Sequence, residues 1–138
     1  MMADSDTGEI TPSKEDYLKI MLELSKGEGI RSIDIARALG ISKASVSRMM
    51  GTLKDEGYVT KEKYGTVTLT EKGRNVAANI KRRYELLKRF LQDVLGVEAS
   101  TAAKDACRIE HLISPETMDK VDRQLEKLPG YKRKTDFL

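Results

Sequence analysis

The sequence predicts a mostly α-helical fold with one small β-hairpin. Apolar residues recur three and four positions apart through most of the chain, which is the spacing of a buried helix face. Glycines divide these segments into short helices, and one stretch, residues 59–69, has two runs rich in β-branched residues around a turn. Hydrophobic residues make up 39% of the chain and charged residues 34%, a composition typical of globular, helix-rich proteins.

Three helices are predicted before this hairpin. Thr11 or Ser13 can cap the first helix, which begins with acidic residues. A second, short helix is expected to be capped by Ser32 and to end at Gly40, and Ser42 is a natural N-cap for the third. Two short helices separated by a glycine and a tight turn form a helix-turn-helix pattern.

The hairpin and three further helices complete the predicted fold. Residues 59–61 and 66–69 are the expected strands, and a hairpin directly after a helix-turn-helix forms a wing. A long helix is predicted over residues 71–95, followed by helices over 100–113 and 115–128.

Charge is distributed unevenly, although the net charge is only +3. Residues 36–54 contain four basic and no acidic residues, and residues 72–92 contain seven basic residues and one acid. Residues 93–130 reverse this balance, with five basic and eight acidic residues. A basic front half and an acidic back half suit a DNA-binding module joined to a cation-binding or dimerising one, although solvated helix faces explain most charge runs.

Several classes of protein are excluded by composition. One cysteine allows no internal disulfide and fits a reducing compartment. No apolar run approaches the roughly 20 residues that span a bilayer, and the acidic, polar residues 1–10 do not form a signal peptide. We therefore expect a cytoplasmic protein without membrane contact.

The helix after Ser42 is the expected DNA-recognition element. In a helix-turn-helix the second helix lies in the major groove, and its N-terminal residues face the base edges. Arg48 can donate two hydrogen bonds to a guanine, Ala44 can contact a thymine methyl, and wing lysines can contact phosphates. The predicted DNA-binding residues are Lys43, Ala44, Ser45, Ser47, Arg48, Lys61 and Lys63. The structural alternative is an ordinary pair of packed helices.

Cys107, Glu110 and His111 form a Cys-x-x-Glu-His cluster in the predicted helix over residues 100–113. Residues three and four apart share a helix face, so a thiol, a carboxylate and an imidazole can converge there. Together these ligand types suit a transition-metal ion. Cys107 is the only cysteine and His111 the only histidine of the chain. The alternative for each residue is structural, as a buried core cysteine or a hydrogen-bonded histidine.

A winged helix-turn-helix, a long helix and a Cys-x-x-Glu-His helix, in this order, resemble the DtxR/MntR family of metal-dependent transcriptional repressors. The resemblance covers residues 13–130. It rests on short stretches at residues 15–18, 35–39, 45–49, 57–59, 69–73 and 107–111, of which the last is the most specific. The chain ends before the SH3-like third domain of longer members, so it resembles the short, two-domain type.

The resemblance implies one metal site whose side-chain ligands are Asp16, Cys107, Glu110 and His111. An aspartate at position 16 is typical of the short members. A cysteine at position 107 is typical of the iron-type members, whereas manganese-type members have a glutamate there. The implied cofactor is a divalent transition metal, Fe²⁺ or Mn²⁺, and Zn²⁺, Co²⁺ or Ni²⁺ are expected to bind in vitro.

Four residues depart from the ligands of the family's second metal position. Lys19 stands where short members have a glutamate, and Tyr84 stands where they have a histidine. Ala103 and Lys88 replace ligands of the ancillary site in iron-type members. Our hypothesis is that the Lys19 ammonium occupies the space of the second cation and that Tyr84 donates a hydrogen bond to the same acids.

The expected fold class is therefore mostly α, with a winged helix-turn-helix DNA-binding domain plus an α-helical dimerisation and metal-binding domain. The expected bounds are 1–10 for a disordered N-terminus, 11–72 for the first domain and 73–138 for the second, which includes the linker helix. The expected function is a repressor of iron or manganese homeostasis, whose homodimer binds a palindromic operator in double-stranded DNA when metal is bound. Candidate dimer contacts, with core packing as the alternative, are Leu112, Met118, Val121 and Leu125.

Two alternative functions come from other classes. The first is a metal-independent winged-helix regulator in which Cys107 is a redox sensor or a core residue. The second is a small metal enzyme with Glu110 as general base. No glycine-rich loop or second catalytic cluster supports the enzyme, so we expect no enzymatic activity.

Overall fold

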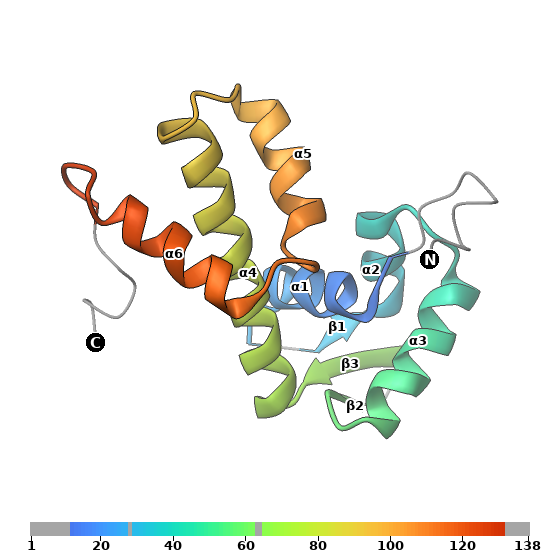
Figure 1. The fold of residues 1–138 in the computed structure, drawn as a ribbon. Coiled ribbons are helices and arrows are strands. Elements are labelled where there is room, and N and C mark those ends of the chain that lie inside the picture. Colours follow the sequence, from blue (N-terminus) through green and yellow to red (C-terminus); the bar gives the residue numbers. More distant parts are fainter. Residues whose placement is uncertain (1–11, 28, 63–64, 132–138) are drawn as a thin grey trace. The chain divides into compact units, whose positions relative to one another are not determined.

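The structure is a computed structural model that describes residues 12–27, 29–62 and 65–131. The predicted disordered N-terminus, residues 1–10, and the wing residue Lys63 lie outside the described residues. In chain order the elements are α1 (Lys14–Leu24), β1 (Ile30–Arg31), α2 (Ser32–Leu39), α3 (Lys43–Asp55), β2 (Val59–Lys61), β3 (Thr66–Leu69), α4 (Glu71–Asp93), α5 (Ala99–Ile109) and α6 (Pro115–Leu125) (Figure 1). The prediction of a mostly helical protein with a small sheet is confirmed.

The chain divides into two compact units, and the boundary falls inside α4, between Ala78 and Asn79. We call them the N-terminal unit and the C-terminal unit. Each has its own apolar core. The core of the N-terminal unit is built from α1, α2, α3, the sheet and the start of α4, and its most deeply buried side chains are Leu18, Met21, Ile35, Val46, Met50 and Leu53. Among the described residues, no helix carries an apolar stretch long enough to cross a lipid bilayer.

The small sheet of the N-terminal unit has the strand order β1–β3–β2, and both pairings are antiparallel. β2 pairs with β3 so that Val59 lies opposite Leu69 and Lys61 opposite Val67, which confirms the predicted hairpin. The third strand, β1, was not predicted. It pairs with the other edge of β3, where Ile30 lies opposite Val67. Two residues are too few to show the alternating pattern by which a strand is recognised in a sequence.

Side-chain caps fix the starts of α1 and α3 in the N-terminal unit. Ser13 and Asp16 form a capping box at the start of α1, in which each side chain accepts a hydrogen bond from the other residue's backbone N–H. Ser42 caps α3 as predicted. The prediction that Ser32 caps α2 is wrong, because β1 runs directly into the helix. Arg31 is therefore the extended N-cap residue, and Ser32 is already helical.

In the C-terminal unit, α5 and α6 pack with the second part of α4 (Figure 1). The buried core residues are Leu86, Leu87, Ala106, Met118, Val121 and Leu125. Three of the four candidate dimer contacts thus belong to this core, whereas Leu112 is 87% exposed. The helix expected over residues 100–113 is shorter at its end, because α5 stops at Ile109.

Candidate metal centre and nucleic-acid interface

The end of α5 carries the Cys-x-x-Glu-His cluster. Cys107 lies in the last turn of the helix, Glu110 is its C-cap, and His111 lies in the turn beyond. The Glu110 backbone keeps helical angles (φ −55°, ψ −29°), and its N–H donates to the Ala106 carbonyl at 3.0 Å. The helical path therefore continues far enough to bring Cys107 and Glu110 onto one face, even though α5 has formally ended.

Two further donor groups lie beside the Glu110 carboxylate. Cys107 Sγ and a carboxylate oxygen of Glu110 lie within 4.8 Å of each other, and His111 Nε2 lies 3.4 Å from Glu110 Oε1. Cys107 is exposed, His111 is half-buried, and Glu110 has 0% of its area exposed. A buried carboxylate needs hydrogen bonds or positive charge nearby, and thiolate, carboxylate and imidazole together suit a transition metal. The residues present therefore fit the metal ion that the family implies.

Asp16, the fourth predicted ligand, is a half-buried residue of α1 in the N-terminal unit. Its Oδ2 accepts a hydrogen bond from the Ser13 N–H at 2.9 Å, which fixes the carboxylate at the start of the helix. Asp16 and the turn after α5 belong to different units.

The residues of the altered second metal position also come from both units. Lys19 is half-buried and follows Asp16 by three residues on α1, so the two side chains share a helix face. Tyr84, on α4, packs against the core of the C-terminal unit. Ala103 and Lys88 are half-buried residues of the C-terminal unit. Neither an alanine methyl group nor a charged ammonium group ligates a metal ion.

One residue at the candidate metal centre was missed by the sequence analysis. Arg83, on α4, donates from its guanidinium to the backbone carbonyl of Glu110. In the sequence Arg83 belongs to a basic run on a long helix, and such runs are usually solvated. No spacing rule connects it to a turn that lies 27 residues later in the chain.

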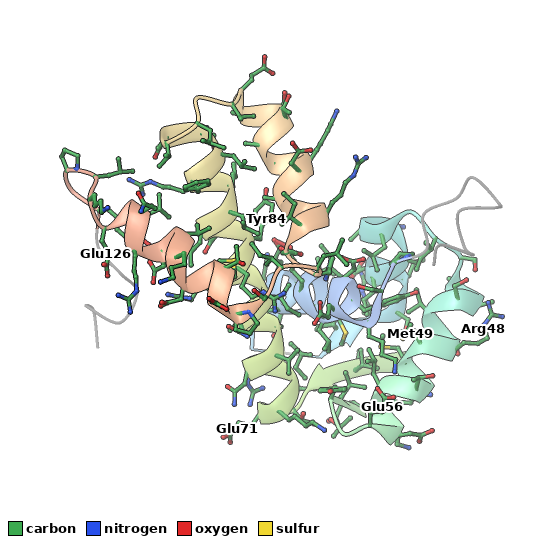
Figure 2. All side chains as sticks on the ribbon, viewed as in Figure 1. Arg48, Met49, Glu56, Glu71, Tyr84 and Glu126 are labelled. Atoms are coloured by element: carbon green, nitrogen blue, oxygen red, sulfur yellow. The ribbon has the colours of Figure 1, made fainter. Side chains whose placement is uncertain are left out.

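The predicted DNA-binding residues that the structure describes lie on α3 and at the end of β2. Five of them are exposed, namely Lys43, Ala44, Ser47, Arg48 and Lys61, and Ser45 is half-buried. Figure 2 shows the Arg48 side chain extending from α3 away from the core of the N-terminal unit. A helix that presents short side chains and two cations in this way can approach a phosphate backbone closely.

Hydrogen bonds organise the start of α3. The Ser42 side chain accepts from the Ser45 N–H at 3.1 Å, and its hydroxyl donates to Ser45 Oγ at 3.0 Å. Arg48 Nη2 reaches the same Ser45 Oγ at 3.4 Å. Burial raises the pKa of Tyr17, and the positive charge of Arg48 opposes this rise. The cation at the exposed face thus acts electrostatically on a buried residue of α1.

Comparison with known proteins places each part of the chain. Residues 9–67 match the family model described as iron dependent repressor, N-terminal DNA binding domain, and residues 70–129 match iron dependent repressor, metal binding and dimerisation domain. The chain is 36% identical over 112 residues to the HTH-type transcriptional regulator MntR of Lysinibacillus sphaericus, which covers 80% of each protein. It is 35% identical over 120 residues to an HTH-type transcriptional regulator of Methanocaldococcus jannaschii, which covers 86% of this chain and 96% of that protein.

A solved structure shares the fold. The manganese regulator SloR superposes with a TM-score of 0.75 at 35% identity, over 86% of this chain and 56% of that one. This chain therefore spans little more than half the length of that structure.

A winged helix-turn-helix followed by a helical metal-binding and dimerisation domain defines a metal-responsive transcriptional regulator. The chain belongs to the DtxR/MntR family of metal-dependent repressors, in which a divalent metal is the cofactor and DNA is the partner. The family is not one of enzymes, so the small metal enzyme is ruled out and the prediction of no enzymatic activity is confirmed.

Proposed function

We propose that this chain represses genes of iron or manganese homeostasis and that its homodimer binds operator DNA more tightly when a divalent cation joins its two units. The observation that carries this proposal is the buried Glu110 carboxylate with the Cys107 thiol and the His111 imidazole beside it. A bound divalent ion supplies the positive charge that lets a thiolate and carboxylates share one small space.

Asp16 couples metal binding at this site to the DNA-binding unit. It belongs to α1, which packs into the core of the DNA-binding unit through Tyr17 and Leu18. Asp16, Cys107, Glu110 and His111 can share one ion only when the two units are correctly placed. Metal affinity therefore favours that placement, by no more than the difference in affinity between the two arrangements of the chain.

The homodimer is proposed to bind a palindromic operator in double-stranded DNA, because a two-fold dimer presents two copies of α3 to two half-sites. Arg48 is proposed to donate two hydrogen bonds to a guanine. The other contacts that we propose for α3 and the wing are those of Lys43, Ala44, Ser45, Ser47, Lys61 and Lys63. A DNA-bound repressor acts in the compartment that holds the DNA, so a cytoplasmic location is part of the proposal.

The physiological ion is proposed to be iron or manganese. Cys107 favours iron, since a thiolate with an imidazole suits Fe²⁺, Co²⁺, Ni²⁺ or Zn²⁺ better than Mn²⁺. The manganese regulator SloR, which shares the fold, favours manganese. We further propose that Lys19 and Tyr84 replace the second cation, so that each protomer binds one ion tightly. Two tightly bound ions per protomer, counted by mass spectrometry of the native protein, would contradict this.

The central experiment compares operator binding with and without metal. Operator DNA is first selected from random-sequence pools with the full chain and Mn²⁺ or Co²⁺, and affinity is then measured with each metal and with a chelator. Asp16→Asn keeps an acceptor for the Ser13 N–H, and Cys107→Ala changes an exposed side chain, so both variants should fold. We expect both to lose the metal-dependent gain in affinity.

Glu23→Ala is the matched control for Asp16→Asn, because Glu23 is an exposed carboxylate on the same helix. It should respond to metal like the wild-type chain. Equal DNA affinity of the wild-type chain with chelator and with metal would refute the proposed function and favour a metal-independent winged-helix regulator.

A further inference from the structure

Arg83, on α4, contacts the turn after α5 that carries Glu110 and His111. Its Nη2 donates to the backbone carbonyl of Glu110, the C-cap residue of α5. Both residues belong to the C-terminal unit, so the contact lies within one compact body. The contact is with the backbone of Glu110, whereas Cys107 and His111 lie beside its carboxylate.

The end of a helix explains why a cation is useful there. The last carbonyls of a helix have no intrahelical donor, and they carry partial negative charge. The Ile109 carbonyl is satisfied by the N–H groups of Leu112 and Ile113, at 2.8 and 3.0 Å. The Glu110 carbonyl is satisfied by the Arg83 guanidinium, which also places a positive charge at the end of the helix.

Arg83 is half-buried, and one atom of its guanidinium is fully buried. Arg83 Nε is buried and has no hydrogen-bond acceptor among the described residues. A buried donor without an acceptor lowers the stability of the fold, so its presence calls for a role other than stabilisation. Holding the guanidinium against the Glu110 peptide is an explanation that serves the site rather than the core.

We propose that Arg83 is a positioning residue of the metal site, which fixes the Glu110 peptide so that Cys107, Glu110 and His111 are held ready for one ion. This inference rests on the proposed function, because it assigns Arg83 a role in that same site. Outer hydrogen bonds of this kind orient metal ligands, and their removal lowers metal affinity without removing a ligand.

The neighbouring residue Arg82 provides a matched control. Arg82 Nη2 donates to the buried Asp122 carboxylate at 3.1 Å, and Asp122 also accepts from the Tyr131 hydroxyl at 2.9 Å. Arg82 thus makes a partly buried polar contact in the same unit, from the same helix, but it contacts a carboxylate of α6 rather than the turn after α5. Arg82→Gln should lower stability while leaving metal affinity unchanged.

The experiment titrates the full chain with Co²⁺, whose thiolate charge-transfer absorption reports coordination by Cys107. Arg83→Gln is expected to lower Co²⁺ affinity about tenfold and to weaken this absorption, whereas Arg82→Gln should match the wild type. Arg83→Lys keeps a donor and a charge, and it should recover part of the lost affinity. Hydrogen exchange of the Leu112 and Ile113 amides in the metal-free protein should be faster in Arg83→Gln, which is a readout independent of metal.

Each negative result of this experiment has a distinct interpretation. A wild-type chain that binds no Co²⁺ would refute the proposed function and, with it, this inference. Wild-type binding with unchanged affinity and absorption in Arg83→Gln would overturn the inference while leaving the proposed function standing. Equal losses of affinity in Arg83→Gln and Arg82→Gln would also overturn it, because a general loss of stability would then explain both.

Discussion

The two units differ in whether their functional charged side chains are exposed or buried. In the N-terminal unit, the described DNA-contact candidates that carry charge are Lys43, Arg48 and Lys61, and all three are exposed. In the C-terminal unit, two carboxylates are buried, Glu110 with 0% and Asp122 with 2% of its area exposed. Among the described residues, no other polar or charged side chain is buried to this degree.

For Glu110 the difference follows from what each unit is proposed to bind, whereas Asp122 is a structural carboxylate that accepts from Arg82 and Tyr131. DNA binds by exchanging condensed counterions for lysine and arginine side chains, so these cations stay hydrated until the partner arrives. A small cation needs its ligands in place beforehand, and fixed hydrogen bonds hold buried carboxylates in one geometry. Exposed charges therefore contribute little to folding, whereas a buried carboxylate must be satisfied within the fold.

Removing the Asp122 carboxylate tests the buried half of this comparison. Asp122→Ala is expected to lower the free energy of unfolding by about 2 to 3 kcal/mol, because it deletes the acceptor of Arg82 and Tyr131. Urea unfolding followed by circular dichroism measures this loss. Asp119→Ala on the same helix is the matched control, since its exposed ion pair with Arg123, at 2.9 Å, contributes no more than about 0.5 kcal/mol. Equal losses in the two variants would remove the distinction between buried and exposed carboxylates.

Removing exposed cations of the N-terminal unit tests the other half. Arg48→Ala should change the free energy of unfolding by less than about 0.5 kcal/mol, because the side chain is exposed. It should weaken binding to the selected operator by about 2 kcal/mol, with the loss confined to certain base positions.

Lys61→Ala should instead weaken binding to specific and non-specific DNA alike and reduce the slope of the salt dependence of binding by about one. Fluorescence anisotropy over a range of salt concentrations measures both effects, and a stability loss in Arg48→Ala as large as its binding loss would contradict the comparison.

Local rules predicted most of the N-terminal unit from the sequence. Ser42 was predicted as a cap because a short hydroxyl side chain precedes a helical pattern, and the hairpin followed from β-branched runs around a glycine. These rules act over a few residues. Cys107 and Glu110 lie close together for the same reason, since residues three apart share one face of a helix.

Contacts between segments that are distant in the chain could not be predicted in this way. An added Cβ at Gly73 would overlap the Tyr58 carbonyl oxygen and lie 3.2 Å from Leu69 Cδ2, so the start of α4 needs a glycine where it meets the wing. Similarly, nothing in the sequence pairs Arg83 with Glu110, or Arg82 with Asp122. Helical spacing in α6 identifies apolar residues such as Met118, Val121 and Leu125, which were given as candidate dimer contacts with core packing as the alternative, and a buried aspartate is invisible to that criterion.

The smallest expected effect concerns Tyr131, whose hydroxyl donates to the buried Asp122 carboxylate. Burial, followed by this hydrogen bond, raises the pKa of Tyr131 from its ordinary value to about 12. The folded chain therefore keeps the proton that the unfolded chain loses near pH 10, so this stabilisation is complete below pH 10 and is lost as the pH rises towards about 12. Tyr131→Phe should cost about 1 kcal/mol near neutral pH, and its stability should approach that of the wild type across this window. Urea unfolding at a series of pH values measures the difference, and a constant difference from pH 9 to 12 would show that the buried carboxylate does not hold the Tyr131 proton.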